Sequence, residues 1–443
     1  MKLIADGRGH VGATQRHRES PEAKPTFFSV PAAPWSCMLV GMLTPAEAEK
    51  LILEHIPSFH EEDCPLASAH GRVLRKNLCA DRDLPPFDRV TMDGYALRAA
   101  ELASGEKKFQ IEGTQAAGMR PFELSAAAGA CIEIMTGAVL PGGADCVVPS
   151  EETARDGDAV VLSATAVKLT AGHAIHRRGS DQRAGGVIVH AGTRLTGRAI
   201  AVAAACGYAT LTVSQQPKIA IVATGDELVE VDAPVAAHQI RRSNDYALRA
   251  AIALAGWPLA ERFHLRDVRH EIEHVLWHIL AEFDVVLIAG GISKGKFDFL
   301  PAELDRQKVT KIFQGVAQRP GKPFWFGISS RQTPVFALPG NPVSAYTCLH
   351  RYVLPALAHA AGLALESPPL VALAEPVAWK APLAYFLPVK LAPGPRGERR
   401  ALPAPSNTSG DFTGLVDSDG FVELPAGPAE VAAGTLVPFR AWV

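Results

Sequence analysis

The feature that most constrains this chain is an alternation of apolar runs and amphipathic segments between residues 218 and 365. Continuous apolar runs at residues 219–223, 284–289 and 334–338 are typical of strands buried on both faces. Apolar side chains at helical spacing between Ile272 and Phe283 predict a helix before the second run, and Ser243 or Asn244 opens another. We therefore expect a parallel sheet with helices on both of its faces.

Three segments rich in glycine and proline follow this sheet pattern and place a hydroxyl or a cation beside the turn. They are Gly290-Gly291-Ile292-Ser293 leading to Asp298, Arg319-Pro320-Gly321-Lys322-Pro323, and Leu338-Pro339-Gly340-Asn341-Pro342-Val343-Ser344. Ligands of such sheets bind beyond the carboxyl ends of the strands, where these segments are expected. The pattern predicts a rigid oxyanion pocket, because proline and glycine fix the backbone and its N–H groups.

The bulk composition excludes several other classes of function. A chain of 443 residues is too long for one core, and its 48% hydrophobic and 20% charged residues are typical of two to four soluble domains. The formal net charge of -2 gives no general attraction to nucleic acid or anionic membranes, so an anion site must be local. Seven cysteines without a C-x-x-C pair favour a reducing cytoplasm over a zinc or disulfide framework.

The first 42 residues differ from the rest. They mix arginine, histidine, glycine and proline without periodicity, which indicates a disordered tail or a misassigned start codon, with Met42 as the alternative start. Thr44 directly after this tail is expected to cap a helix, with Pro45 at its first position and Glu47 completing a capping box.

The individual turns each allow a plain structural interpretation beside the functional one. Thr224 and Gly225 turn the backbone toward an anion, and Glu227 suits a metal ion or a ribose, but helix-capping acids have the same pattern. Ser293 and Asp298 suit a phosphate and Mg²⁺, although a single glycine turn is weak evidence and the spacing is not that of a Walker A loop.

The second and third segments are equally open. Arg319 and Lys322 are positioned cations, or merely solvated ones. Asn341 caps the helix that follows, and this role is compatible with anion binding by the helix N-terminus and Ser344.

A further set of turns lies between residues 83 and 181. Asp93 follows a double proline in an Asp-Gly-Tyr-Ala turn, where Asp88 and Asp93 are candidate ligands. Phe87 and Tyr95 are candidates for packing against a flat heterocycle, or else they are buried aromatics of a tight turn. Similar turns surround Thr136 and Asp181.

Taken in order, the motifs D-G-Y-A, M-T-G-A, G-x-D, T-G-D-E-L, G-G-x-S, P-G-K-P and L-P-G-N-P-V-S resemble the molybdopterin molybdenumtransferase family, the bacterial MoeA type, related to the E domains of gephyrin and of plant Cnx proteins. The resemblance extends from about residue 43 to residue 443. It implies insertion of molybdate into adenylylated molybdopterin with the help of Mg²⁺, giving molybdenum cofactor and AMP.

The resemblance also implies a multidomain fold of α/β and β type. The expected parts are a tail at 1–42, a linker or dimerisation domain at 43–83 plus 185–215, a β-rich insert at 84–184, a molybdopterin-binding parallel-sheet α/β domain at 216–366 and a small C-terminal β-barrel at 367–443. It implies a cytoplasmic homodimer whose cleft is shared between the sheet domain of one subunit and the insert of the other. From the resemblance we also expect contacts with molybdopterin adenylyltransferase and with recipient molybdoenzymes.

Carried onto this sequence, the resemblance assigns roles to particular residues. The site acids and metal ligands are Glu227, Asp267 and Asp298. The substrate-binding residues are Thr224, Gly225, Ser293, Arg319, Lys322, Gly340, Asn341 and Ser344. The catalytic residues are Asp93, Thr136 and Asp181 of the insert and, from the sheet domain, Glu227 and Asp298.

Three departures and three alternatives accompany the resemblance. Lys294 and Lys296 add charge to the glycine turn, Arg319 stands where many relatives have lysine, and Arg89-Val90-Thr91 replaces the more usual Asn-Ser-Ala. The alternatives are a molybdopterin adenylyltransferase, disfavoured by the insert and the C-terminal module, a tungstate enzyme, and a scaffold protein, disfavoured by the absence of a fused domain.

Overall fold

The computed structural model describes residues 42–292, 300–379, 382–405, 407–427 and 429–442. A six-stranded sheet in the order β16-β13-β17-β21-β20-β18 forms the centre of the predicted sheet domain. The strands are β13 (Ile219–Thr224), β16 (Glu261–Leu265), β17 (Val285–Ala289), β18 (Thr310–Gln314), β20 (Trp325–Ile328) and β21 (Pro334–Leu338). A two-stranded parallel ladder of β14 (Leu228–Val229) and β15 (Ile240–Arg241) follows β13 along the chain.

The sheet is parallel over four strands and antiparallel at one edge. β13 pairs in parallel with β16 and β17, and β17 pairs in parallel with β21, as the alternating pattern predicts. β20 runs antiparallel to β21, and β18 runs antiparallel to β20. The predicted parallel sheet is present, and two further strands that were not predicted extend it, because a tight turn at residues 329–333 joins β20 to β21 as an antiparallel hairpin.

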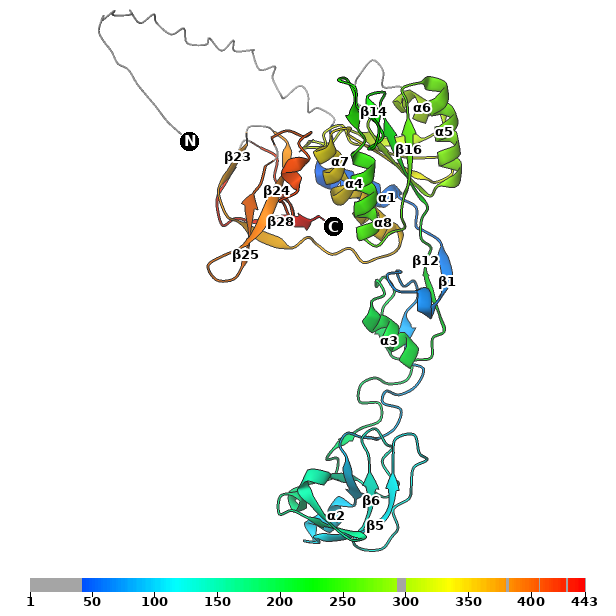
Figure 1. Cartoon of the computed structure of the whole chain (residues 1–443), viewed down its shortest axis with the longest axis vertical. Helices are drawn as coiled ribbons and strands as arrows, with labels where there is room; N and C mark the ends of the chain where they lie inside the picture. The colour runs from blue at the N-terminus through cyan, green and yellow to red at the C-terminus, as the bar shows by residue number, and fades with distance from the viewer. Residues whose placement is uncertain (1–41, 293–299, 380–381, 406, 428, 443) are drawn as a thin grey trace, which may run out of the picture. The chain divides into compact units, whose positions relative to one another are not determined.

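Helices cover both faces of this sheet, as expected (Figure 1). Ile219 and Ile221 of β13 point into a core shared with α4 and α8, whereas Ala220 and Val222 point into the core on the other face, shared with α5 and α6. The strand residues alternate between the two faces because side chains along a strand have a period of two. The helices are α4 (Asn244–Leu254), α5 (Arg269–Glu282), α6 (Leu300–Arg306), α7 (Pro342–Cys348) and α8 (Leu354–Ala360), with a π-helical turn at Leu349–Val353.

Helix α1 (Pro45–His55) has the predicted start. The Thr44 hydroxyl accepts a hydrogen bond from the Glu47 backbone, and the Glu47 carboxylate accepts one from the Thr44 backbone, so the capping box is present. Its buried residues Ala48 and Ile52 join the same core as α4 and α8. Helix α1 is therefore packed on the sheet domain.

The insert holds a six-stranded sheet in the order β7-β4-β6-β5-β9-β8. Its strands are β4 (Gly94–Leu97), β5 (Lys108–Gln115), β6 (Ala130–Ile134), β7 (Cys146–Pro149), β8 (Thr153–Asp156) and β9 (Ala159–Leu162), accompanied by α2 (Ala99–Ala103) and a ladder of β3 (Arg89–Val90) with β10 (Ile175–His176). Gly94 is required here, because a Cβ atom at this position would lie 2.0 Å from the Val148 carbonyl oxygen. The predicted β-rich character is confirmed.

A smaller module connects the insert to the sheet domain. It consists of α3 (Gly197–Ala205), a ladder of β1 (Glu61–Pro65) with β12 (Thr210–Ser214), and a ladder of β2 (Leu78–Cys79) with β11 (Val187–Val189). Leu74, Leu78 and Ala203 belong to a hydrophobic core of its own. The alanine-rich segment thus forms a helix that packs on this small core.

The C-terminal module is a closed five-stranded barrel, as expected. β24 (Ala384–Pro393) pairs with both β25 (Arg399–Pro403) and β26 (Gly420–Leu424), and the ring closes through β22 (Leu370–Leu373) and β28 (Leu436–Ala441). A separate ladder joins β23 (Val377–Trp379) to β27 (Ala429–Val431). Strand β19 (Gln318–Arg319) of the sheet domain adds to β24 in parallel, which places Arg319 opposite Tyr385.

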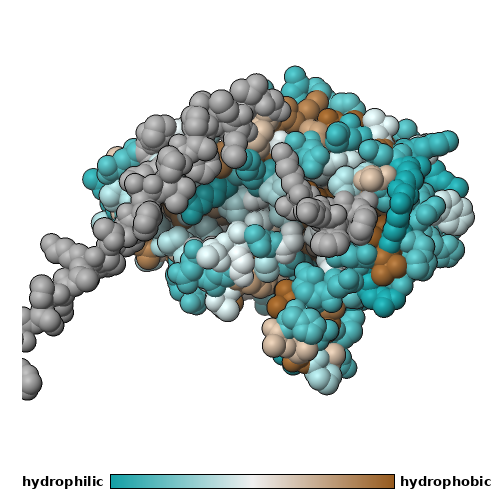
Figure 2. Space-filling model, turned by 90° about the horizontal axis from the view of Figure 1, so that it is seen from above, coloured by the Kyte–Doolittle hydropathy of each residue, from teal (hydrophilic) through white to brown (hydrophobic). Residues whose placement is uncertain are grey.

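The surface and the cysteines agree with the composition. Hydrophilic residues cover most of the face drawn in Figure 2, and hydrophobic residues gather there in small separate patches. Among the described helices, none is both long enough and apolar enough to cross a membrane. The six cysteines in the described ranges are all free thiols.

Candidate active site

Glycine turns surround a hollow of about 610 Å³ beyond the carboxyl ends of β13, β17 and β21. We name it the glycine hollow. Among the residues that line it are Thr224, Gly225, Glu227, Asn244, Asp245, Asp267, Gly290, Gly291, Gly340, Asn341 and Gly410. The topology therefore brings predicted residues from three separate strand ends into one space, at the edge of the sheet where ligands are expected.

Two of the predicted acidic residues line the glycine hollow on neighbouring loops. Glu227 follows β13, and Asp267 follows β16. The backbone N–H of Asp267 donates a hydrogen bond of 3.0 Å to the Asp226 carboxylate, which ties the two loops together. Both predicted acids thus line one hollow on loops that are fastened to each other.

Asn244 and Asp245 at the start of α4 also line the glycine hollow, and their roles were not predicted. The Asn244 amide donates to the Gly340 carbonyl at 2.7 Å, so it holds the glycine turn after β21. Asp245 is fully buried and is paired with Arg242 and, at 3.2 Å, with Arg262. Within the described part of the chain, Oδ1 of each residue is buried without a hydrogen-bond partner. Both atoms are free to accept a donor from a ligand.

A second hollow of about 380 Å³ adjoins the first and contains fixed cations. We name it the cation hollow. The residues that line it include Arg319, Gly321, Lys322, Pro323, Asn341, Ser344, Leu383, Tyr385, Thr408 and Ser409. The Arg319 guanidinium lies over the Tyr385 ring at 5.1 Å from its centroid, which restrains the cation on a strand of the barrel.

The backbone of the cation turn is held from behind by buried side chains. Gly321 has φ +96°, and a Cβ atom there would lie 2.7 Å from the Cys348 sulfur. Gln318 is fully buried, donates to that sulfur at 3.5 Å, and accepts a hydrogen bond from the Tyr352 hydroxyl. The turn that carries Lys322 therefore has little freedom, as the proline and glycine pattern predicts.

Asn341 belongs to both hollows and connects the sheet domain to the barrel. It occupies the N-cap position of α7, but its side chain makes no capping hydrogen bond. Instead its amide donates to the Ser409 hydroxyl at 2.8 Å, and the Val343 N–H donates to the Ser409 carbonyl at 3.1 Å. The expectation of side-chain capping was wrong, because the Val343 N–H, which a capping side chain could accept, donates to the Ser409 carbonyl instead.

Asp93 and Thr136 are brought together within the insert. The Asp93 carboxylate accepts hydrogen bonds from the Thr136 hydroxyl at 2.7 Å and from the Thr136 N–H at 2.6 Å. These hydrogen bonds lower the pKa of Asp93 from its ordinary value, because they stabilise the ionised form. Tyr95 is buried in the core of the insert, so the buried-aromatic interpretation applies to it.

Asp181 is held by a histidine that sequence reasoning missed. His176 Nε2 lies 2.7 Å from the Asp181 carboxylate, and Arg89 Nη2 lies 3.2 Å from His176 Nδ1. Because guanidinium nitrogens only donate, Nδ1 accepts and Nε2 carries the proton that is given to Asp181. Arg89, one of the departures from the family pattern, thus fixes the histidine tautomer.

The predicted site residues that the structure describes fall into three groups. Glu227, Asp267, Thr224, Gly225, Gly340 and Asn341 line the glycine hollow, whereas Arg319, Lys322, Ser344 and again Asn341 line the cation hollow. Asp93, Thr136 and Asp181 lie on the insert and line neither hollow. Ser293 and Asp298, like Lys294 and Lys296, lie outside the described residues.

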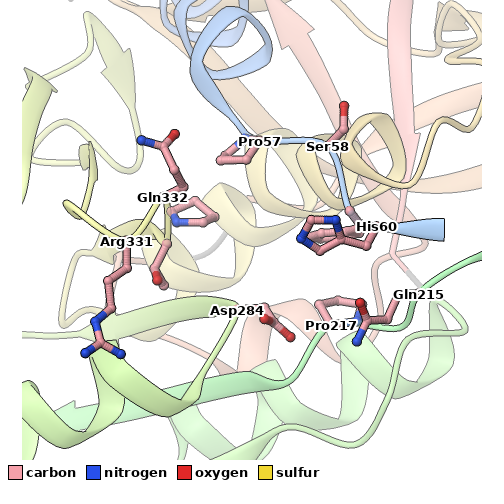
Figure 3. A pocket seen from close by; sticks show the side chains of 11 residues that line it. Pro57, Ser58, His60, Gln215, Pro217, Asp284, Arg331 and Gln332 are labelled. Carbon is pink, nitrogen blue, oxygen red and sulfur yellow. The ribbon is translucent and has the colours of Figure 1, made fainter. Parts of the chain in front are cut away.

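Another hollow, of about 130 Å³, lies where the parallel strands of the sheet begin, at the opposite end from the glycine hollow (Figure 3). It is formed where the chain leaves the sheet domain at Pro57 and Ser58 and returns at Gln215 and Pro217. The Gln215 N–H donates to the His60 carbonyl at 2.7 Å across these two connections. None of the predicted site residues in the described ranges lines it, so we assign it to the connection between domains.

Comparisons with known proteins agree with this geometry. Residues 43–207 match a model of the MoeA N-terminal region (domains I and II), residues 220–359 match a probable molybdopterin binding domain, and residues 371–442 match the MoeA C-terminal region (domain IV). The chain belongs to the MoeA family. The three matched regions cover the sheet domain, the insert with its connecting module, and the barrel.

Relatives of the family extend over most of the chain. It is 41% identical over 404 residues to the molybdopterin molybdenumtransferase of Synechocystis, covering 90% of this chain and 100% of that protein. It is 33% identical over 386 residues to that of Synechococcus elongatus, covering 86% and 94%. The crystal structure of a molybdopterin biosynthesis MoeA protein from Pyrococcus horikoshii superposes with a TM-score of 0.76 at 29% identity, covering 91% and 99%.

The donor set of the glycine hollow fits a magnesium ion. Among the described residues, no group of three histidine, cysteine or carboxylate side chains forms a closed metal site. Mg²⁺ is usually bound by one or two carboxylates together with the phosphates of a substrate. Glu227 and Asp267 beside the glycine turns supply such a partial set.

Proposed function

We propose that this protein is a molybdopterin molybdenumtransferase, which inserts molybdate into adenylylated molybdopterin and releases AMP. The observation that carries the proposal is that two hollows adjoin at Asn341 in a chain of the MoeA family. The cation hollow contains fixed cations, and the glycine hollow contains glycine turns and acids. The first suits a small oxyanion, and the second suits a nucleotide phosphate.

The cation hollow is proposed to bind molybdate. Molybdate is a tetrahedral dianion, and charge-assisted hydrogen bonds from lysine and arginine are the strong ones for such a group. Lys322 and Arg319 supply the charge, while Ser344, which is 3% exposed, and Ser409 supply hydroxyls at the wall. Arg319 stands where many relatives have lysine. Because arginine can donate two hydrogen bonds at once to an oxyanion, it can fill the same binding role.

The glycine hollow is proposed to bind the pyrophosphate that joins molybdopterin to AMP. Glycine turns at Gly225, Gly290 and Gly340 allow the backbone to approach phosphate oxygens closely. Glu227 and Asp267, with Asp298 as a third ligand, would hold Mg²⁺, which neutralises charge on the phosphates when bound. Asn244 and Asp245 offer acceptors to the hydroxyl or N–H donors of the substrate.

The chemistry that these residues supply is positioning and charge neutralisation. A water oxygen bonds to phosphorus as the P–O bond of the phosphoanhydride breaks, and AMP leaves. The two thiols of the pterin bond to molybdenum through sulfur, and one molybdate oxygen leaves with their two protons as water. Fixed cations and backbone N–H groups stabilise charge that develops on the phosphate oxygens. No side chain of the two hollows needs to act as a nucleophile.

The insert is proposed to complete the cleft of a second subunit. Asp93, Thr136 and Asp181 gather on one module but line neither hollow of their own chain, which supports a homodimer with shared sites. The domain boundaries given above belong to the same proposal, as do a cytoplasmic location and contacts with molybdopterin adenylyltransferase and recipient molybdoenzymes.

The central test is a direct assay of the purified protein. With adenylylated molybdopterin, molybdate and Mg²⁺, we expect molybdate-dependent release of AMP, measured by chromatography. A parallel reaction with tungstate tests the selectivity of the oxyanion. Absence of AMP release that depends on the oxyanion would contradict the proposed function.

The shared cleft has its own test. An Asp93→Asn protein and a Lys322→Ala protein are expected to be inactive separately, because each lacks one half of every site. After mixing and exchange of subunits, about a quarter of the wild-type activity should return, since half of the dimers are mixed and each has one intact site. If mixing restores nothing while exchange is verified, the cleft lies within one chain.

A further inference from the structure

A hollow of about 240 Å³ lies where the parallel strands of the central sheet begin, at the opposite end of the strands from the glycine and cation hollows. It is enclosed by α5, the turn after α6 and the turn that joins β20 to β21. The residues that line it are Trp277, Leu280, Ala281, Arg306, Gln307, Lys308, Ser329, Ser330 and Arg331. Three of these are cations and none is a carboxylate, so the hollow is suited to an anion.

Lys308 stands at a backbone position where glycine is favoured. The Val309 N–H donates to the Leu304 carbonyl and the Lys308 N–H donates to the Asp305 carbonyl, which is the hydrogen-bond pattern of a Schellman motif at the end of α6. Lys308 accordingly has φ +57°. A side chain at this position costs stability relative to glycine, so the lysine is not explained by the fold.

The turn on the other side of the hollow shows the same feature. Gln332 has φ +66°, and the turn is closed by hydrogen bonds between Ser329 and Thr333 and from Gln332 to Ser329. The described ranges contain three non-glycine residues with left-handed φ. Two of them, Lys308 and Gln332, lie in the two turns beside this hollow. The turn holds Arg331, whose guanidinium donates to the Ala281 carbonyl at 3.4 Å at the end of α5.

The positive charge of the hollow is only partly compensated. Arg306 pairs at 2.9 Å with Glu303, a carboxylate that is itself buried. In the described part of the chain, neither Lys308 nor Arg331 forms an ion pair with a carboxylate. Glu282 and Asp305 lie on the flanking helices, yet neither lines the hollow. Two exposed cations thus share a small concave space with the hydroxyl of Ser330.

Trp277 adds an aromatic surface at this hollow. Its side chain is 58% exposed, whereas the other tryptophans in the described ranges are buried or partly buried. We propose that this hollow is a second, non-catalytic site for a small phosphate-bearing ligand with a flat aromatic ring, of the mononucleotide class. The hollow is smaller than a typical ligand pocket. It accommodates the phosphate and sugar of the ligand, and the aromatic ring of the ligand stacks on Trp277 at the rim.

The test uses the full chain with AMP, adenosine and inorganic phosphate as probes, following tryptophan fluorescence. AMP is expected to quench the emission saturably, and Trp277→Phe should abolish that part of the signal. Adenosine and phosphate should each bind at least tenfold more weakly than AMP, because each makes only one of the two contacts. Lys308→Gly should weaken AMP binding about tenfold through loss of a charge-assisted contact, with an unchanged or higher melting temperature.

The controls separate this site from the proposed active site. Lys311→Gln removes an exposed lysine on β18 that does not line the hollow, and it should leave AMP binding unchanged. AMP bound in the glycine hollow needs neither Trp277 nor Lys308, so failure here leaves the transferase proposal intact. The inference is overturned if no Trp277-dependent signal occurs, if Lys308→Gly binds AMP like the wild type, or if phosphate alone binds as tightly as AMP.

Discussion

The glycine hollow and the cation hollow are neighbours, but they are built differently. Of the sixteen described residues that line the cation hollow, six come from the barrel module. Of the twenty-two described residues that line the glycine hollow, only Gly410 does. The glycine hollow is therefore a property of the sheet domain, whereas the cation hollow exists only where the barrel is docked on that domain.

This difference shows which contacts each hollow depends on. Arg351 is 3% exposed and pairs with Glu423 of the barrel at 2.9 Å and with Glu49 of α1 at 2.8 Å. The Arg351–Glu423 pair and the Asn341–Ser409 hydrogen bond fasten the barrel to the sheet domain, and the Arg351–Glu49 pair holds the arginine in place. Changes to the fastening should therefore affect oxyanion binding more than nucleotide binding.

Lys322→Ala is expected to have the largest effect. Removing one preorganised charged donor from the reacting centre should lower kcat by about 10²–10³-fold. Because Lys322 lines only the cation hollow, AMP affinity of the glycine hollow should remain within about twofold, as expected for a site with no lost contact. The measurements are molybdate-dependent AMP release and calorimetric titration with AMP.

Lys311→Ala is the matched control for this variant, since Lys311 is exposed on β18 and lines neither hollow. It should behave like the wild type in both measurements. An equal loss of AMP affinity and turnover in Lys322→Ala would show that the two hollows are one binding unit.

Arg351→Ala tests the fastening itself. Removal of this buried cation leaves Glu423 without its partner and leaves Glu49 with only Arg440, at 3.5 Å, so the free energy of unfolding should fall by about 3 kcal/mol. Urea unfolding measures this loss. In the protein that still folds, the KM for molybdate should rise more than the dissociation constant for AMP.

Arg351→Lys keeps the charge but cannot contact both carboxylates with the same geometry, so an intermediate stability is expected. If the stability falls while the ratio of the two affinities stays at its wild-type value, the barrel contact does not shape the cation hollow.

Much of the sheet domain was predictable, and the missing parts have a physical reason. β13, β17 and β21 are buried on both faces, so they appear as unbroken apolar runs. β16 is an edge strand with exposed or half-buried Glu261 and His264, and its polar residues hide it from such a pattern. The hairpin that adds β20 is specified by a turn without glycine, which sequence reasoning did not detect.

The site residues were predictable only where they lie together in one short segment of the sequence. Lys322 and Arg319 were found because proline and glycine surround them in the sequence. Tyr385 and Ser409 were missed, because they reach the cation hollow only through the pairing of β19 with β24 and the hydrogen bond from Asn341. Contacts between segments so far apart leave no local pattern.

A smaller, pH-dependent effect is expected from His350, which is packed between Tyr346 and Trp442 of the barrel. Burial lowers the pKa of His350 from 6.5 to about 4. Between these values the unfolded chain binds the proton and the folded protein does not, so the free energy of unfolding falls as the pH decreases from about 6.5 to about 4. The loss should amount to roughly 3 kcal/mol.

Urea unfolding of the wild type and of His350→Gln at several pH values checks this effect. The variant has no group that titrates at this position, and the difference between the two proteins should therefore shrink toward pH 4. Parallel curves over the whole range would show that His350 is not the titrating group.

The smallest effect is expected from Tyr385→Leu, which removes the ring under Arg319 and leaves the charges of both hollows in place. A cation–π contact at a partly exposed site contributes about 1 kcal/mol, so molybdate affinity should fall roughly fivefold. Tyr385→Phe keeps the ring and should retain the affinity, whereas AMP binding should not respond to either change, because Tyr385 does not line the glycine hollow. If Phe and Leu weaken molybdate binding equally, the hydroxyl of Tyr385, and not its ring, is what positions Arg319.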